Sequence, residues 1–171
     1  FNTDSMTFQI LEGQKKNRPK INFEIFKTRD KTIWKMFAKH HYLNHSHNNA
    51  AHTYVAYVNE QIAAFISVIH QPHSIKNLKR IHRLVVMPDF QGIGIGGRLL
   101  DFIAKKYTND NYKLSITTSA PSLIFSLKKH KEWICLHFGR QKGVHKNKEL
   151  QKTTTKNRIT AAFRYIKNGT K

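Results

Sequence analysis

Residues 84–104 read LVVMPDFQGIGIGGRLLDFIA, and this stretch decides the fold. An apolar, β-branched run ends at Pro88, which has no N–H to donate to a sheet and therefore ends a strand. Four of the eight glycines in the chain lie between Gly92 and Gly97. Apolar residues then recur at helical spacing. The stretch predicts a strand, a glycine-rich loop and an amphipathic helix in direct succession.

The glycine-rich loop is suited to hold an anion. Residues without a β-carbon allow tight turns and let backbone amides come close to a ligand. The start of the following helix adds unpaired amides and the positive end of the helix dipole at the same place. The pattern therefore indicates a site for a pyrophosphate.

Two common nucleotide motifs do not fit this loop. A Walker phosphate loop needs Lys and Ser or Thr after its last glycine, but Arg98 and Leu99 follow Gly97. Gly92, Gly94 and Gly97 match the spacing of a dinucleotide fingerprint, but four residues separate the strand from the first glycine, and no acidic residue ends the next strand. A tight turn without a ligand is a further alternative, although such a turn needs one glycine and not four.

The pattern that remains is Gln91-x-x-Gly94-x-Gly96, preceded by Leu84-Val85-Val86-x-Pro88 and followed by an amphipathic helix. It resembles the acyl-CoA-binding motif of the GNAT N-acetyltransferase superfamily, and the order of elements resembles that family from about residue 23 to residue 166. The resemblance implies an N-acyltransferase that uses acetyl-CoA or another acyl-CoA and lets a deprotonated amine attack the thioester directly. It implies that the pantetheine arm is held by the backbone of Leu84, Val85 and Val86. The pyrophosphate would be held by the amides of Gln91, Gly92, Ile93, Gly94, Ile95, Gly96 and Gly97.

The rest of the chain predicts a single α/β domain over residues 21–171. The expected strands cover residues 21–27, 53–58, 62–70, 81–87, 114–118, 133–138 and 160–166. The expected helices cover residues 33–41, with Asp30 and Thr32 as candidate N-caps, residues 94–104, and a segment that begins at Pro121. This order predicts a mixed, mostly antiparallel sheet flanked by helices on both faces. Residues 1–20 are expected to be a flexible N-terminus or a tag remnant.

Composition points to an anionic partner. The 171 residues include 30 Lys and Arg but only 10 Asp and Glu, which gives a formal net charge of +20. Such an excess attracts polyanions, so DNA or RNA is the leading macromolecular partner, although an AT-rich genome also produces Lys-rich chains. The densest basic segment comprises Arg140, Lys142, Lys146, Lys148, Lys152, Lys156 and Arg158. It is expected to contact phosphates, and a solvated charged loop is the alternative.

Histidines are the candidates for the catalytic base. His40 and His41, with Tyr42 beside them, end the first predicted helix, and His82 lies on the strand that precedes the glycine loop. Histidine titrates closest to neutral pH, although each of these side chains could equally be a packed or surface residue. The tyrosine that many GNAT proteins use as the general acid is missing from PSLIFSLKKH, where Ser126 stands near the expected place.

Neither a metal site nor a disulfide is expected from the sequence. Five histidines lie between His40 and His52, but no Cys, Asp or Glu accompanies them, so no metal site is expected. Because Cys135 is the single cysteine, the chain cannot form an internal disulfide. The Cys135 side chain is expected to be buried on a strand. The longest apolar stretch is too short to span a membrane, and the first residues lack a signal pattern. We therefore expect a cytoplasmic protein with no membrane partner.

A tryptophan-bearing helix that ends in HHYL, followed by PDFQGIGIG, is similar to GNAT-like proteins of phages and mobile elements. One branch of these, typified by the DNA-modification protein of phage Mu, alters adenine. The leading hypothesis is therefore an N-acyltransferase whose acceptor amine lies on or near nucleic acid. The alternatives are a DNA base modification enzyme on the same scaffold and a non-catalytic nucleic-acid-binding module.

Overall fold

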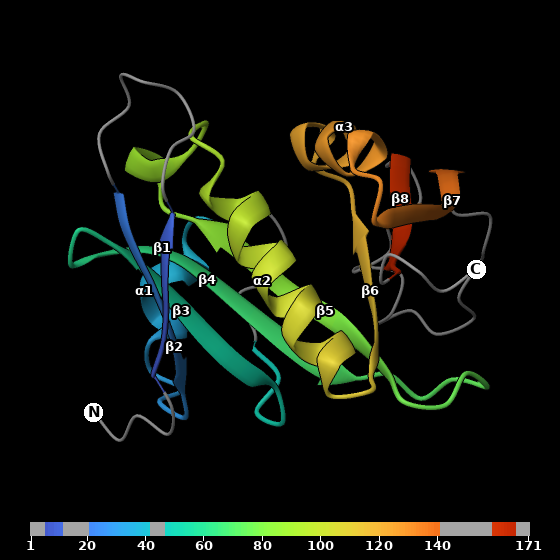
Figure 1. The fold of residues 1–171 in the computed structure, drawn as a ribbon, viewed down its shortest axis with the longest axis horizontal. Coiled ribbons are helices and arrows are strands. Elements are labelled where there is room, and N and C mark those ends of the chain that lie inside the picture. Colours follow the sequence, from blue (N-terminus) through green and yellow to red (C-terminus); the bar gives the residue numbers. More distant parts are fainter. Residues whose placement is uncertain (1–5, 12–20, 42–46, 141–158, 167–171) are drawn as a thin grey trace. The chain divides into compact units, whose positions relative to one another are not determined.

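A computed structural model describes residues 6–11, 21–41, 47–140 and 159–166, which form two compact units (Figure 1). The first unit contains the chain up to His70 together with residues 81–103. The second contains residues 71–80 and the chain from Ala104 onward. Strand β5 (Leu78–Val86) and helix α2 (Ile95–Asn109) each continue from one unit into the other.

The sheet of the first unit is antiparallel from β1 to β4. Strand β2 (Ile21–Thr28) pairs with β3 (His52–Val58), which pairs with β4 (Gln61–His70), and β5 lies next to β4. A two-residue turn of Asn59 and Glu60 joins β3 to β4, and both residues have positive φ angles, 47° and 68°. This is the turn geometry that matches the twist of a tight hairpin. The strands predicted over residues 53–58 and 62–70 are confirmed, and they form a hairpin.

Strand β1 (Met6–Leu11) was not predicted from the sequence. It pairs antiparallel with β2, so that Phe8 lies opposite Glu24, and it falls inside the segment expected to be a loose N-terminus. The backbone partners that β2 offers decide its conformation, and these are invisible in a local pattern.

Both faces of the first sheet are covered. Six consecutive residues of β4, from Ala63 to Val68, are buried, which requires side chains on both faces to pack against other elements. On one face, Trp34 and Phe37 of helix α1 (Trp34–Ala38) join a core cluster with Phe65 of β4. Burying each such side chain contributes about 1.5–3 kcal/mol.

Helix α1 is shorter than predicted, and its capping differs. The residue before it is Ile33, which makes no side-chain capping bond. Asp30 instead accepts hydrogen bonds from the backbone N–H and the hydroxyl of Thr32, at 2.8 and 2.7 Å. The two polar residues satisfy each other in the preceding turn, so neither caps the helix as expected.

The second unit contains β6 (Lys113–Thr118), α3 (Pro121–Lys129), β7 (Trp133–Arg140) and β8 (Ile159–Tyr165). Its strands follow the order β6-β8-β7 with antiparallel pairing, and β7 and β8 are orange and red in Figure 1. The start of β5 lies beside β6, where the Lys113 N–H donates to the carbonyl of Asn77 at 3.0 Å. Strand β5 therefore begins at Leu78, three residues before the predicted start of the strand over residues 81–87.

Strand β7 corrects one further expectation. Cys135 is exposed and not buried, and Leu136 and Phe138 beside it are also exposed. Strand β7 is the last strand in its sheet and pairs with β8 on one side only, which is consistent with its exposed side chains. Apart from these differences, the predicted mixed, mostly antiparallel α/β architecture is confirmed. None of the helices in the described ranges is both long and apolar enough to cross a membrane.

Candidate functional site

The loop between β5 and α2 is braced at its first turn. A short 3-10 helix (Pro88–Phe90) follows β5, and the Phe90 and Gln91 amides donate to the carbonyls of Met87 and Pro88. The side-chain amide of Gln91 donates to the carbonyl of Val86 at 3.0 Å. Gln91 thus ties the loop to the end of the strand that precedes it.

Two glycines in the loop have backbones that other residues rarely adopt. The φ angles of Gly92 and Gly94 are 82° and 87°. A residue with a β-carbon would cost about 1–2 kcal/mol in this left-handed region. Gly96 serves a different purpose, because a β-carbon there would lie 3.0 Å from Cγ2 of Val86. The helix therefore starts in close contact with the strand.

The start of α2 presents free backbone donors. Its first helical hydrogen bond runs from the Arg98 N–H to the Gly94 carbonyl, at 3.1 Å. The amides of Ile95, Gly96 and Gly97 therefore have no acceptor within the helix. A β-carbon built on Gly97 would meet no atom within 4 Å, so space lies beside this turn. Unpaired helix donors, the positive helix end and the space beside Gly97 together fit a pyrophosphate group.

The three strand residues predicted to hold the pantetheine arm lie in the same unit as the loop. Val85 is buried and joins the core cluster with Trp34 and Phe65. Leu84 and Val86 are partly exposed. The structure thus brings the strand end and the loop together, as the sequence predicted, and their role in binding stays a prediction.

The predicted catalytic histidines lie in different environments. His40 is exposed, whereas His41 is buried and its ring lies 5.7 Å from the Trp34 ring. His82 lies within β5 and is partly buried. Tyr42 lies outside the described residues.

A histidine that the sequence analysis did not single out, His47, lies beside His82. The two ring centroids are 6.0 Å apart, and the His47 ring also lies 5.6 Å from the rings of Trp34 and Phe65. Both ring nitrogens are buried, and neither has a hydrogen-bond partner among the described residues. Burial lowers the pKa of His47 below its ordinary 6.5, and the positive charges of Arg83 and Lys31 lower it further.

This environment makes His47 a neutral imidazole at pH 7, the state that accepts a proton. Nothing in the sequence distinguishes it from its neighbours, because five histidines lie within thirteen residues. Only the packing of Trp34 and Phe65 around it sets it apart. Among the described side chains, no group of three or more His, Cys, Asp or Glu is placed to hold a metal ion.

The remaining predicted positions lie mostly beyond what the structure describes. Arg140 ends β7 and is exposed. The other members of the basic segment lie outside the described residues: Lys142, Lys146, Lys148, Lys152, Lys156 and Arg158. Helix α3 forms where predicted, and Ser126 on it is exposed.

Comparison with known proteins now identifies the fold. A family model described as the acetyltransferase (GNAT) domain matches residues 18–123, more than half of the chain. The chain belongs to the GNAT acetyltransferase family. As a GNAT acetyltransferase it uses acetyl-CoA. A search of curated protein sequences found no significant match.

Solved GNAT structures share the fold at low sequence identity. An IAA acetyltransferase from Bacillus cereus has a TM-score of 0.63 at 14% identity, covering 84% of this chain and 99% of its own. The ribosomal-protein-S18-alanine N-acetyltransferase of Escherichia coli has a TM-score of 0.60 at 12% identity, with 87% and 99% covered. A GNAT acetyltransferase from Elizabethkingia anophelis, solved with acetyl-CoA bound, has a TM-score of 0.53 at 15% identity, with 84% and 97% covered. The likeness to the phage Mu branch stays a prediction.

Proposed function

We propose that this GNAT protein transfers the acetyl group of acetyl-CoA to an amine, with the pyrophosphate held by the backbone amides of residues 92–97, while the amide of Gln91 stays bonded to the Pro88 carbonyl. The observation that supports this proposal most directly is the start of α2, where the Ile95, Gly96 and Gly97 amides have no acceptor within the helix and space lies beside Gly97. Acetyl-CoA supplies an activated thioester carbonyl. An acceptor nitrogen is in keeping with the name of the Escherichia coli neighbour, an alanine N-acetyltransferase.

The transfer needs one proton to be moved. The neutral amine forms a bond to the carbonyl carbon, the carbon–sulfur bond breaks, and coenzyme A leaves with the electron pair on sulfur. The amine nitrogen then loses one proton to a base, and the thiolate gains one proton from solvent or an acid. Ser126 is a poor acid at neutral pH, and a coenzyme A thiolate is stable enough to leave without strong assistance.

His47 is the base that the geometry supports best. It is held neutral by its surroundings, and its nitrogens have no competing partner among the described residues. His82 lies beside it and would share or relay the proton. His40 and His41 remain the other candidates for the base, and Tyr42, which lies outside the described residues, stays a predicted neighbour of theirs.

A second candidate places the acceptor amine on or near nucleic acid. The observation that favours it is the net charge of +20, which concentrates polyanions around the protein. Base modification of DNA would be one form of this function. Membership of an acetyltransferase family favours an enzyme over a non-catalytic binding module.

The experiment that tests the first proposal is a thiol-release assay with acetyl-CoA and a panel of small amines, peptides and oligonucleotides. Release that depends on an amine, with an acetylated amine detected by mass spectrometry, is the expected result. Release without any acetylated amine would contradict it. Acetylation confined to the oligonucleotides would select the second candidate.

A further inference from the structure

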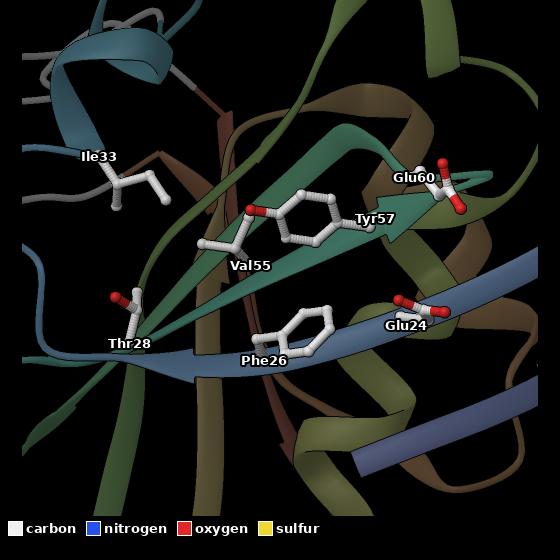
Figure 2. Close-up of a pocket in the computed structure, with 7 residues that line it drawn as sticks. All are labelled: Glu24, Phe26, Thr28, Ile33, Val55, Tyr57 and Glu60. Carbon is white, nitrogen blue, oxygen red and sulfur yellow. The ribbon is translucent and has the colours of Figure 1, made fainter. Parts of the chain in front are cut away.

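A pocket of about 340 Å³ opens in the first unit between strands β2 and β3 and the start of α1 (Figure 2). It shares no residue with the glycine loop or with the histidine cluster. Its volume lies within the range of small-molecule sites.

The walls of the pocket are aromatic and branched apolar side chains. The antiparallel register places Phe26 opposite Val55 and Glu24 opposite Tyr57, so these four side chains share one face of the sheet. The Phe26 and Tyr57 rings meet edge to face, with centroids 5.3 Å apart. Ile33, which precedes α1, closes one end of the pocket (Figure 2). Such walls suit an aryl or alkyl group.

The opposite end of the pocket is acidic. Glu24 comes from β2 and Glu60 from the β3–β4 turn, and Figure 2 shows both carboxylates at this end. Among the described residues, neither carboxylate forms an ion pair or a hydrogen bond. Two negative charges at the same end of an apolar pocket favour a ligand that carries positive charge.

The composition of the chain makes this acidic end unusual. Only 10 residues are Asp or Glu against 30 Lys and Arg, and two of the ten lie at this one pocket. Most of the protein repels an organic cation, whereas this pocket attracts one. A negatively charged ligand would meet both carboxylates and is excluded on the same ground.

The backbone holds Glu60 in place. It is the second residue of the two-residue turn, with a φ angle of 68°, where glycine or asparagine is normally preferred. The preceding Asn59 fixes this turn to β2, because its N–H donates to the Asn22 carbonyl at 3.0 Å and its side-chain oxygen accepts from the Asn22 N–H at 3.3 Å. A carboxylate therefore stands at a place where a better turn former would be expected.

We propose that this pocket binds a small organic ammonium ion whose body is an aryl or alkyl group. The ammonium group lies between Glu24 and Glu60, and the apolar body packs against Phe26, Tyr57 and Ile33. Attraction between the cation and the faces of the aromatic rings adds to the charge pairing. Binding here is independent of acetyl-CoA and of the proposed transfer reaction.

The test is an NMR titration of the full chain without acetyl-CoA, using 2-phenylethylammonium and hexylammonium as probes. Neutral 2-phenylethanol and the anion phenylacetate are the matched ligand controls. We expect at least one ammonium probe to bind with shifts at Phe26, Val55 and Tyr57, the neutral probe to bind roughly tenfold more weakly, and the anion not to bind. Binding of neither ammonium probe, or equal binding of the neutral probe, overturns the proposal.

Variants locate the binding and separate it from folding. Glu24→Gln and Glu60→Gln should each lower the affinity for the ammonium probe by roughly tenfold, because each removes one charged partner. Asp110→Asn, an exposed charge change at the end of α2, is the control and should leave affinity unchanged. Glu60→Gly should raise the thermal midpoint, since glycine suits the positive φ angle, and still weaken binding. Unchanged affinity in the three glutamate variants contradicts the proposal.

Discussion

The imidazole rings of His47 and His82 lie 6.0 Å apart, although the first follows helix α1 and the second lies within strand β5. Trp34 and Phe65 pack against the His47 ring, and both of its nitrogens are buried. His82, a predicted candidate for the base, thus lies beside His47, whose surroundings lower its pKa.

Replacing His47 with Gln should lower kcat by roughly 10²-fold while leaving the affinity for acetyl-CoA unchanged, because a general base acts on the acceptor proton and not on the cofactor. Steady-state kinetics and calorimetry measure the two quantities. The paired variant His40→Ala with His41→Ala is the comparison and should retain most of the turnover. Full turnover in His47→Gln, with loss in the paired variant, would return the role of base to His40 or His41.

The lowered pKa of His47 should also appear in the pH dependence of stability. Burial keeps the folded-state pKa below 6.5, so near this pH the unfolded chain binds a proton that the folded chain does not. The free energy of unfolding therefore falls as the pH drops through 6.5 towards the folded-state pKa, and this contribution is constant above about pH 7. The measurement is urea unfolding of the parent and His47→Gln between about pH 5 and pH 8. Parallel curves for the two proteins would argue against a buried His47.

Alanine substitutions at Gly94 and Gly97 should change the free energy of unfolding by different amounts. Gly94→Ala should lower the free energy of unfolding by about 1–2 kcal/mol, because its φ angle of 87° is left-handed. Gly97→Ala should be neutral or stabilising by up to about 1 kcal/mol, since a β-carbon there meets no atom and alanine favours the helix. Denaturant unfolding measures both. Equal effects at the two positions would contradict the described loop.

The basic segment should bind nucleic acid through phosphates. If about four of its seven cations engage duplex DNA, the slope of log K against log salt should be near −3.6, because each phosphate contributes roughly 0.9. Replacing Lys146, Lys148 and Lys152 with Gln should flatten the slope by about two to three units and leave sequence preference unchanged. Titrations of both proteins at several salt concentrations provide the test. An unaltered slope would show that this segment is a solvated loop.

Much of the fold was predictable because its decisive signals are local. Pro88 ends a strand, and the glycines from Gly92 onward mark a turn that leads into a helix, so the order of strand, loop and helix follows from neighbouring residues. The extra strand Met6–Leu11 and the exposure of Cys135 were missed. Both depend on which strands lie beside them and on what covers them, and these are relationships between segments far apart in the chain.

The site residues that were predicted are likewise those with a local signal in the sequence. Gln91 and the glycines lie together in sequence and were found together. His47 acquires its character from two rings on other elements. Trp34 lies on helix α1, before His47 in the chain, and Phe65 lies on strand β4, eighteen residues after it. The pocket with Glu24 and Glu60 arises only when β2 and β3 pair. Contacts of this kind leave no periodic pattern in the sequence.

Acetyl-CoA is expected to bind through the backbone amides of residues 92–97, and calorimetry with acetyl-CoA tests this most directly. The parent protein should bind, and Gly94→Trp and Gly97→Trp should abolish binding, because each places a bulky side chain in the loop or beside the first turn of the helix, where the pyrophosphate must lie. A β-carbon at Gly97 meets no atom within 4 Å, whereas one at Gly96 would press against Val86. Circular dichroism should show that both variants remain folded, and Ser126→Ala on α3 should bind like the parent. Unchanged affinity in a folded Gly94→Trp or Gly97→Trp variant would contradict this expectation.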